Sequence, residues 1–163
     1  MKFFETSKYH SFKKSTYISL RWIGMAGQFI AVNFVYFILN FEFNWLSSNI
    51  TIFFGILSNL YLTLIYKKTQ LSDRSAFIFL VFDILQLGIL IYLTGGVANP
   101  FVIFLLIPSV FSSSNLSFKT NSLLVFLTTV VIIFLTFFST DLPGPISDHF
   151  HVSPYYYYAI PVS

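Results

Sequence analysis

Residues 84–118 read ILQLGILIYLTGGVANPFVIFLLIPSVFSSSNLSF and contain no charged side chain. A helix crosses a hydrocarbon core about 30 Å thick with about 20 apolar residues, so this run is too long for one crossing. Residues 95–100, GGVANP, interrupt it. Gly permits unusual backbone angles, Asn is a good N-cap, and Pro is tolerated at the first helical position. The run therefore predicts a tight turn between two membrane helices, at 76–94 and 100–116.

The composition of the whole chain supports this interpretation. Of its 163 residues, 9% are charged and 56% are hydrophobic, whereas about a quarter of a soluble domain is charged. A disordered chain is excluded because 21% of the residues are aromatic. A net charge of +3 is too small for a nucleic-acid surface, and without Cys there is no disulfide or thiolate chemistry. We expect an integral membrane protein whose main partner is the lipid bilayer.

Charge-free runs elsewhere extend the pattern along the chain. They predict an all-α, polytopic transmembrane helical bundle with five complete helices and the start of a sixth. Four consecutive tyrosines at 155–158 are typical of a membrane interface, and an apolar segment begins after them, so we expect a piece of a longer protein. The predicted segments are a basic cytoplasmic segment at 1–21, helices at 22–41, 48–66, 76–94, 100–116 and 121–139, and a sixth helix from about 155.

The basic residues predict the orientation of these helices. All nine Lys and Arg residues lie in alternate segments, 1–21, 67–75 and 117–121. The connections between those segments, around 42–47, 95–99 and 141–154, contain none. The positive-inside rule then places the N-terminus in the cytoplasm. A signal peptide is not indicated, because the first apolar run is too long and no small-residue cleavage site follows it.

An acidic residue, Asp83, lies near the middle of the predicted helix 76–94. To insert a charged side chain at the centre of a membrane helix costs about 2.5–3.5 kcal/mol. Because such residues are therefore rare, Asp83 is a functional candidate. Gln86 is three residues further on and shares its helix face. Asp83 could be a proton-linked group or lie close to a ligand, and no basic partner for it is evident. Alternatively it is interhelical glue that holds Gln28, Asn33 or Asn59.

The turn GGVANPF is the second candidate site. Every residue in it is also explained by a tight connection between two helices. As a ligand site it would suit a quinone, which needs hydrogen-bond donors, a surface for its ring and access from lipid. Asn99 can donate, Phe101 can pack against a ring, and Gly95 and Gly96 allow a close approach of the backbone.

Several of these segments resemble the membrane domain of RegB/PrrB-type redox-sensing histidine kinases. They are Leu20-Arg21-Trp22, Gly27-Gln28, Asp83, Pro108 and the stretch YLTGGVANPF at 92–101. That family has six transmembrane helices and a GGxxNPF heptad in the outer loop between helices three and four. This sequence matches its five fixed positions, Gly95, Gly96, Asn99, Pro100 and Phe101.

The resemblance implies a redox-sensing input domain in the inner membrane of a bacterium. Its ligand would be ubiquinone or a related quinone, bound at those five residues. The domain would be a homodimer that controls autophosphorylation of a downstream cytoplasmic kinase, and through it a response regulator. The phosphoacceptor region, redox-active Cys and ATP-binding domain of the family have no counterpart in these 163 residues, so no catalytic residue is predicted here.

Other functional candidates are weaker. His149 and His151 lie in a predicted outer loop and His10 in the basic segment, which is too sparse a pattern to predict a metal site. A small transporter, or a membrane subunit of a larger complex, could use Asp83 as a proton-linked or substrate-binding group. Transporters more often show inverted repeats and several intramembrane ionisable groups. A phosphoacceptor His motif and an ATP-binding domain downstream of this sequence would establish the interpretation as a kinase input domain.

Overall fold

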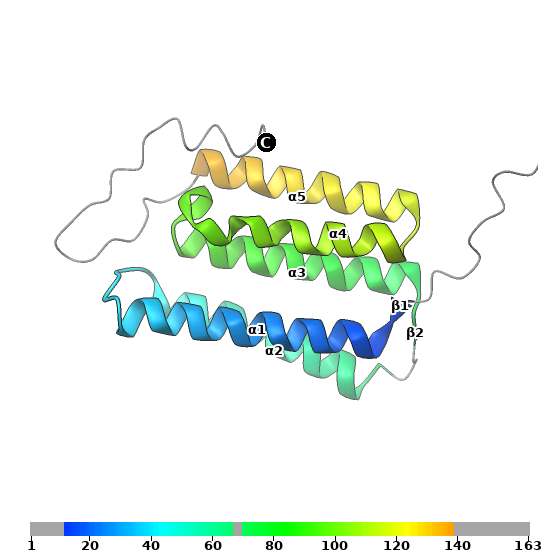
Figure 1. Ribbon diagram of the computed structural model, residues 1–163, viewed down its shortest axis with the longest axis horizontal. Helices are drawn as coiled ribbons and strands as arrows, with labels where there is room; N and C mark the ends of the chain where they lie inside the picture. The colour runs from blue at the N-terminus through cyan, green and yellow to red at the C-terminus, as the bar shows by residue number, and fades with distance from the viewer. Residues whose placement is uncertain (1–11, 67–69, 139–163) are drawn as a thin grey trace, which may run out of the picture.

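A computed structural model describes residues 12–66 and 70–138, which form a bundle of five α-helices (Figure 1). This architecture confirms the predicted all-α class. The helices α1, α2, α3 and α5 are each long and apolar enough to cross a membrane. The predicted sixth helix and all three His residues lie outside the described residues. The elements are α1 (Lys14–Phe37), α2 (Trp45–Leu64), α3 (Asp73–Leu93), η1 (Gly96–Ala98), η2 (Pro100–Leu105), α4 (Leu106–Asn115) and α5 (Phe118–Phe138).

Two short strands accompany the helices. The strand β1 (Phe12–Lys13) pairs in antiparallel fashion with β2 (Gln70–Leu71). The helical periodicity gave no sign of this pairing. It brings the start of α1 to the connection between α2 and α3, where Lys14 Nζ donates to the carbonyl oxygen of Tyr66. The predicted basic segments before α1 and after α2 therefore meet at one end of the bundle.

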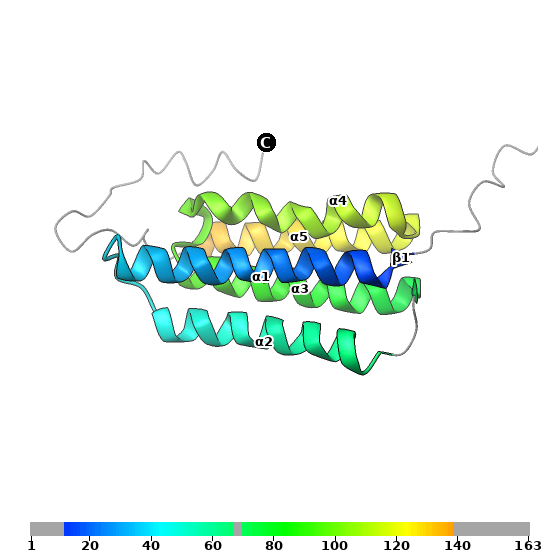
Figure 2. The same cartoon turned by 60° about the horizontal axis from the view of Figure 1, so that its bottom comes forward.

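The helix α3 occupies the centre of the bundle. Figures 1 and 2 show α2 on one side of it and α4 and α5 on another. It has more buried residues than any other helix, because neighbours surround it. Leu80 and Ile84 of α3 are almost completely buried, as are Ile52 of α2 and Leu124 of α5. The core therefore runs along both sides of α3.

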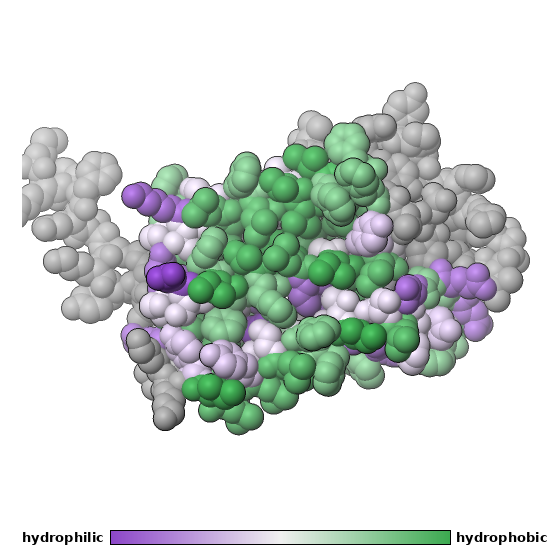
Figure 3. Space-filling model, turned by 180° about the vertical axis from the view of Figure 1, so that it is seen from behind, coloured by the Kyte–Doolittle hydropathy of each residue, from purple (hydrophilic) through white to green (hydrophobic). Residues whose placement is uncertain are grey.

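Large apolar side chains also cover the outside of the bundle. Many Phe, Ile and Leu residues are more than one-third exposed. The face shown in Figure 3 has a broad hydrophobic band with hydrophilic residues towards its two ends. Apolar residues inside and outside, with polar residues at the ends, are what a helical bundle in lipid requires. The protein is a multi-pass membrane protein.

The first helix differs from its predicted range, 22–41. It begins at Lys14, so the last part of the predicted basic segment 1–21 is helical, and it ends at Phe37. The predicted helix starts directly after Arg21, the last charged residue of the basic segment. That criterion was wrong here because Arg21 is only 6% exposed and has an acidic partner. After the helix, Asn40 adopts a left-handed backbone with φ of 53°.

The starts of three later helices also precede their predicted positions by three residues. All three of these starts have side-chain caps: Asn44 accepts a hydrogen bond from the backbone N–H of Ser47, Ser72 accepts one from Ser75, and Ser117 accepts one from Thr120. Such a cap satisfies a free N–H group at the helix start. Counting from the nearest charge missed these caps. The helices are α2, α3 and α5, which begin at 45, 73 and 118 instead of 48, 76 and 121.

The fourth crossing is not the single α-helix predicted at 100–116. It opens as the 3₁₀ helix η2 and continues as α4 to Asn115. A 3₁₀ helix rises about 2.0 Å per residue and an α-helix about 1.5 Å, so these 16 residues extend roughly 27 Å. That length is close to a hydrocarbon thickness of about 30 Å. The tighter winding therefore lets a short segment approach the length of a full crossing.

The connections alternate between the two ends of the bundle, as predicted. The α1–α2 connection and the turn after α3 lie at one end, and the α4–α5 connection lies at the other, near β1 and β2 (Figure 1). At that second end, Asp73 accepts hydrogen bonds from Ser117 N at 2.9 Å and Ser117 Oγ at 2.8 Å. These bonds join the starts of α3 and α5. Which end faces the cytoplasm stays a prediction.

Candidate functional site

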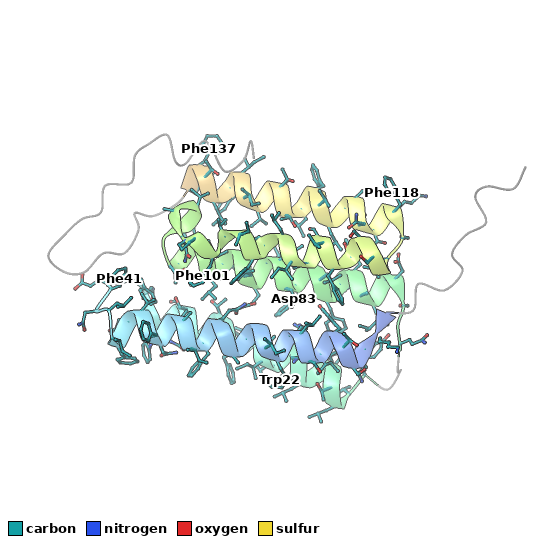
Figure 4. The ribbon with its side chains drawn as sticks, in the orientation of Figure 1. Trp22, Phe41, Asp83, Phe101, Phe118 and Phe137 are labelled. Atoms are coloured by element: carbon teal, nitrogen blue, oxygen red, sulfur yellow. The ribbon has the colours of Figure 1, made fainter. Side chains whose placement is uncertain are left out.

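A cavity of about 680 Å³ lies between α1, α3, η2 and α4. Most of its lining is apolar, and the polar side chains in it come from α1, α3 and the turn that follows α3. In Figure 4, Asp83 and Phe101 both lie on the side of α3 and η2 that faces α1. Six of the predicted site residues line this cavity and Gly95 and Gly96 do not; the six are Gln28, Asp83, Gln86, Asn99, Pro100 and Phe101.

An ion pair joins α1 to α3 at the level of Asp83. The guanidinium of Arg21 approaches Asp83 Oδ1 with Nη2 at 2.7 Å and Nε at 2.9 Å. The hydroxyl of Tyr17 donates to Asp83 Oδ2 at 2.5 Å, and Arg21 Nη2 also donates to Ser58 Oγ of α2 at 3.0 Å. The expectation that Asp83 lacks a basic partner was therefore wrong. Arg21 is 62 residues away in the chain, and no local pattern links the two.

The rest of the guanidinium is enclosed by aromatic rings. Its central carbon lies 5.5 Å from the ring centre of Tyr17 and 5.8 Å from that of Phe79. A cation over an aromatic face is attracted by the ring, more so when water is excluded. The remaining nitrogen, Arg21 Nη1, is buried and has no hydrogen-bond partner among residues 12–66 and 70–138. A buried donor without a partner is uncommon and calls for an explanation.

A second polar contact links the same two helices. Gln86 Nε2 donates to Gln28 Oε1 at 3.0 Å, so these two predicted site residues bind each other. A glycine of α2, Gly55, packs beside Gln86 of this pair. A Cβ atom at Gly55 would lie 3.3 Å from Met25 Cε and 3.5 Å from Gln86 Cδ. A methyl group at Gly55 would therefore crowd the end of Met25 and only touch Gln86, and both of these residues line the cavity.

The alternative that Asp83 holds an amide on a neighbouring helix was partly wrong. Asp83 does join two helices, but its partners are Arg21 and Tyr17. Asn33 accepts from Trp45 Nε1 at 2.8 Å and donates to Asn49 Oδ1 at 3.1 Å. Asn59 donates to the carbonyl oxygen of Ile18 at 3.4 Å. These amides do connect α1 to α2, but none of these contacts is to Asp83.

The turn after α3 is built on its two glycines and Asn99. Gly95 and Gly96 have φ of 115° and 59°, a left-handed backbone that favours glycine. Asn99 Oδ1 accepts from Phe101 N at 2.9 Å and thereby caps η2. Its amide nitrogen donates to Thr94 Oγ1 at 2.8 Å and to Thr94 O at 3.2 Å. The geometry accounts for these residues as a helix connection, which was one of the two interpretations of the turn.

An aromatic pair forms the wall of the cavity beside this turn. The rings of Phe101 and Phe104 are 5.5 Å apart between centres, and both line the cavity. The ring of Phe101 is 43% exposed, so a ligand could pack against it. An apolar cavity with a few convergent polar groups suits an amphipathic small molecule. No cluster of three metal-binding side chains occurs in the described part of the chain.

Comparisons with known proteins agree with this picture. A family model described as a PilS-like transmembrane domain matches residues 20–160. The sensor histidine kinase RegB of Cereibacter sphaeroides is 28% identical over 128 residues, which cover 78% of this chain. The chain spans 28% of the length of that relative. No solved structure matches the chain. Because the family match covers most of its residues and agrees with the resemblance to RegB-type sensor domains, the chain belongs to the family of PilS-like transmembrane domains.

Proposed function

We propose that this membrane domain is the redox-sensing input of a histidine kinase and that it binds a quinone in the cavity between α1, α3 and η2. One observation carries the proposal: the predicted polar residues and the aromatic end of the GGxxNPF turn line a single cavity. The family match favours an input domain over a transporter or complex subunit. A transporter or complex subunit would use Asp83 as a proton-linked or substrate-binding group, and the carboxylate of Asp83 is already paired with Arg21.

The cavity has the properties that a quinone requires. Its volume of about 680 Å³ lies within the range of roughly 300–1,000 Å³ of small-molecule sites. Phe101 and Phe104 offer aromatic faces for the ring, and the apolar walls suit an isoprenoid chain. In this proposal Gly95, Gly96, Asn99 and Pro100 shape the outer end of the site.

Binding would act on the arrangement of the helices. Across the cavity, the two polar contacts described above hold α1 to α3. A ligand between these helices can favour one of two packings only by as much as its affinity for the two differs. Quinone and quinol would therefore shift this equilibrium differently. With the N-terminus in the cytoplasm and two copies forming a homodimer, the change would reach a downstream kinase and its response regulator.

A direct binding experiment tests the proposal. The purified domain, in phosphatidylcholine nanodiscs, is titrated with a short-chain ubiquinone while the fluorescence of its two Trp residues is followed. We expect saturable quenching. An alkyl compound of the same chain length without the ring serves as the control ligand. Quenching that rises in proportion to quinone concentration, without saturation, would contradict the proposal.

A pair of matched variants locates the site. Phe101→Leu removes an aromatic face from the cavity, and we expect it to weaken quinone binding roughly 2- to 10-fold. Phe53→Leu makes the same change on α2, where Phe53 is 55% exposed and does not line the cavity. It should leave the affinity unchanged. Equal effects of the two substitutions would show that the quinone does not bind in this cavity.

A further inference from the structure

We propose that the polar ring substituents of the quinone are bound by the amide pair Gln28–Gln86 and by Arg21, in the interior of the cavity, and not by Asn99 at the turn. This inference rests on the proposed function, because it names the contacts of the same ligand in the same cavity. Along α3, Gln86 is eight residues before Thr94, or roughly 12 Å from the turn. The head group would thus lie deep in the cavity.

Asn99 has little capacity left for a ligand. Its two amide hydrogens are directed at the two oxygens of Thr94, and its carbonyl oxygen caps η2 through Phe101 N. To donate to a quinone, Asn99 would have to give up a bond within the turn. That exchange gains little, because one hydrogen bond replaces another.

The amide pair has capacity to spare. Two glutamine amides offer four N–H donors and two carbonyl oxygens. Gln28 and Gln86 use one donor and one acceptor on each other, and the described residues supply no other partner for either side chain. Whichever of the two amides is the donor, one carbonyl oxygen and three N–H groups remain. In the hydrocarbon region such groups cost free energy until they are bonded, and both residues line the cavity.

Arg21 supplies a second donor one helical turn deeper. Its Nε and Nη2 atoms bind Asp83 and Ser58, whereas Nη1 is buried without a hydrogen-bond partner in the described chain. Asp83 and Gln86 are three residues apart, so the two polar levels are separated by about 5–6 Å. The two oxygens of a quinone lie on opposite edges of its ring. One oxygen can therefore accept from the amide pair, and the other reaches Arg21 Nη1 once a shift of the guanidinium opens that atom, which is buried in this structure, to the cavity.

These contacts distinguish the two redox forms. The oxygens of a quinone only accept hydrogen bonds, whereas the hydroxyl groups of a quinol also donate. The carbonyl oxygen left free on the amide pair can accept from a quinol hydroxyl, and Arg21 can only donate. The two forms would use different atoms of one site and bind with different affinities. Such a difference is what the proposed sensing requires.

The test replaces each glutamine by methionine, which has a similar length and no hydrogen-bonding amide. We expect Gln28→Met and Gln86→Met each to weaken binding of the short-chain ubiquinone about tenfold, since a ligand oxygen is left without a donor. Asn59→Leu removes a buried amide of α2 that does not line the cavity, and it serves as the matched control. Thermal unfolding of each variant verifies that it is folded.

Photolabelling of the unmodified protein provides a second measurement. An azido-substituted ubiquinone should attach to residues 21–28 of α1 or 83–87 of α3. Wild-type affinity in both Met variants, or labelling confined to residues 95–101, would overturn this inference while leaving the proposed function intact. Absence of saturable ubiquinone binding by the wild-type domain would instead overturn the proposed function.

Discussion

A buried guanidinium and a partly buried carboxylate each lose hydration, and in this protein Arg21 and Asp83 offset that loss by binding one another at 2.7 Å. Tyr17 and Ser58 bind further atoms of the pair, and the ring of Phe79 lies against the guanidinium. Removal of one charge would leave the other unpaired in an apolar environment, whereas removal of both would not. The stability of the bundle should therefore depend on the pair as a unit.

A double-mutant cycle measures this dependence. We expect Arg21→Leu and Asp83→Leu each to lower the free energy of unfolding by about 3–5 kcal/mol, and the double variant to lose less than the larger single effect. Unfolding of the purified domain by denaturing detergent gives the values. Ser58→Ala is the control, because it removes only one hydrogen bond and should cost about 1 kcal/mol. Additive losses in the double variant would show that the two residues act independently.

At the scale of the elements, close packing of α3 against α5 depends on a glycine. A Cβ atom at Gly88 would lie 2.9 Å from Val131 Cγ1. A β-branched side chain in a helix has little rotational freedom with which to move away. Small residues commonly allow such close approach of membrane helices. The position of α5 against α3 is thus set in part by the absence of a side chain at residue 88.

Gly88→Ala should therefore destabilise the domain by about 1–3 kcal/mol, the usual cost of overpacking. Adding Val131→Ala should recover most of this loss, because it removes the clashing methyl group. The control is Gly24→Ala on α1, where a Cβ atom would have no neighbour within 4 Å. The same unfolding assay compares the variants. If Gly88→Ala were as stable as Gly24→Ala, the close contact between α3 and α5 would not matter for stability.

At the scale of the whole molecule, the bundle has one basic end. Lys13 and Lys14 lie there with Arg74 and Lys119, close to β1, β2 and the start of α5. The opposite end contains the α1–α2 connection and the GGVANPF turn. Positive charge is retained on the cytoplasmic side of a membrane. The distribution of basic residues over the whole molecule therefore predicts that the end with β1 and β2 faces the cytoplasm.

Single-cysteine labelling in this cysteine-free chain tests that orientation. Glu42 and Gln70 are both exposed and lie at opposite ends of the bundle. In intact cells a membrane-impermeant thiol reagent should label Glu42→Cys, because the α1–α2 connection faces outwards, and it should not label Gln70→Cys. After the cells are opened, both variants should react. Labelling of position 70 in intact cells would show that the orientation is the reverse of the predicted one.

The amino-acid sequence alone determined the class of the molecule and the approximate place of its helices. Hydrocarbon thickness limits a helix to about 20 residues, so the uncharged run 84–118 had to contain a break at Gly95–Pro100. The same limit placed the other helices to within a few residues, except the start of α1. The family resemblance, carried chiefly by the turn, was likewise evident from local sequence. These features depend on residues that are close together in the chain.

The tertiary structure alone decided which side chains meet. The sequence places Arg21 at the end of a basic cytoplasmic segment, yet it lies in α1 as the partner of Asp83, and Gln28 bonds to Gln86 rather than to Asp83. Each of these pairs joins residues about 60 positions apart. Their contact depends on how α1 is rotated and placed against α3, which the packing around Gly55 helps to set. Helix periodicity shows which residues share a face of one helix, whereas the cavity exists only where the faces of several helices come together.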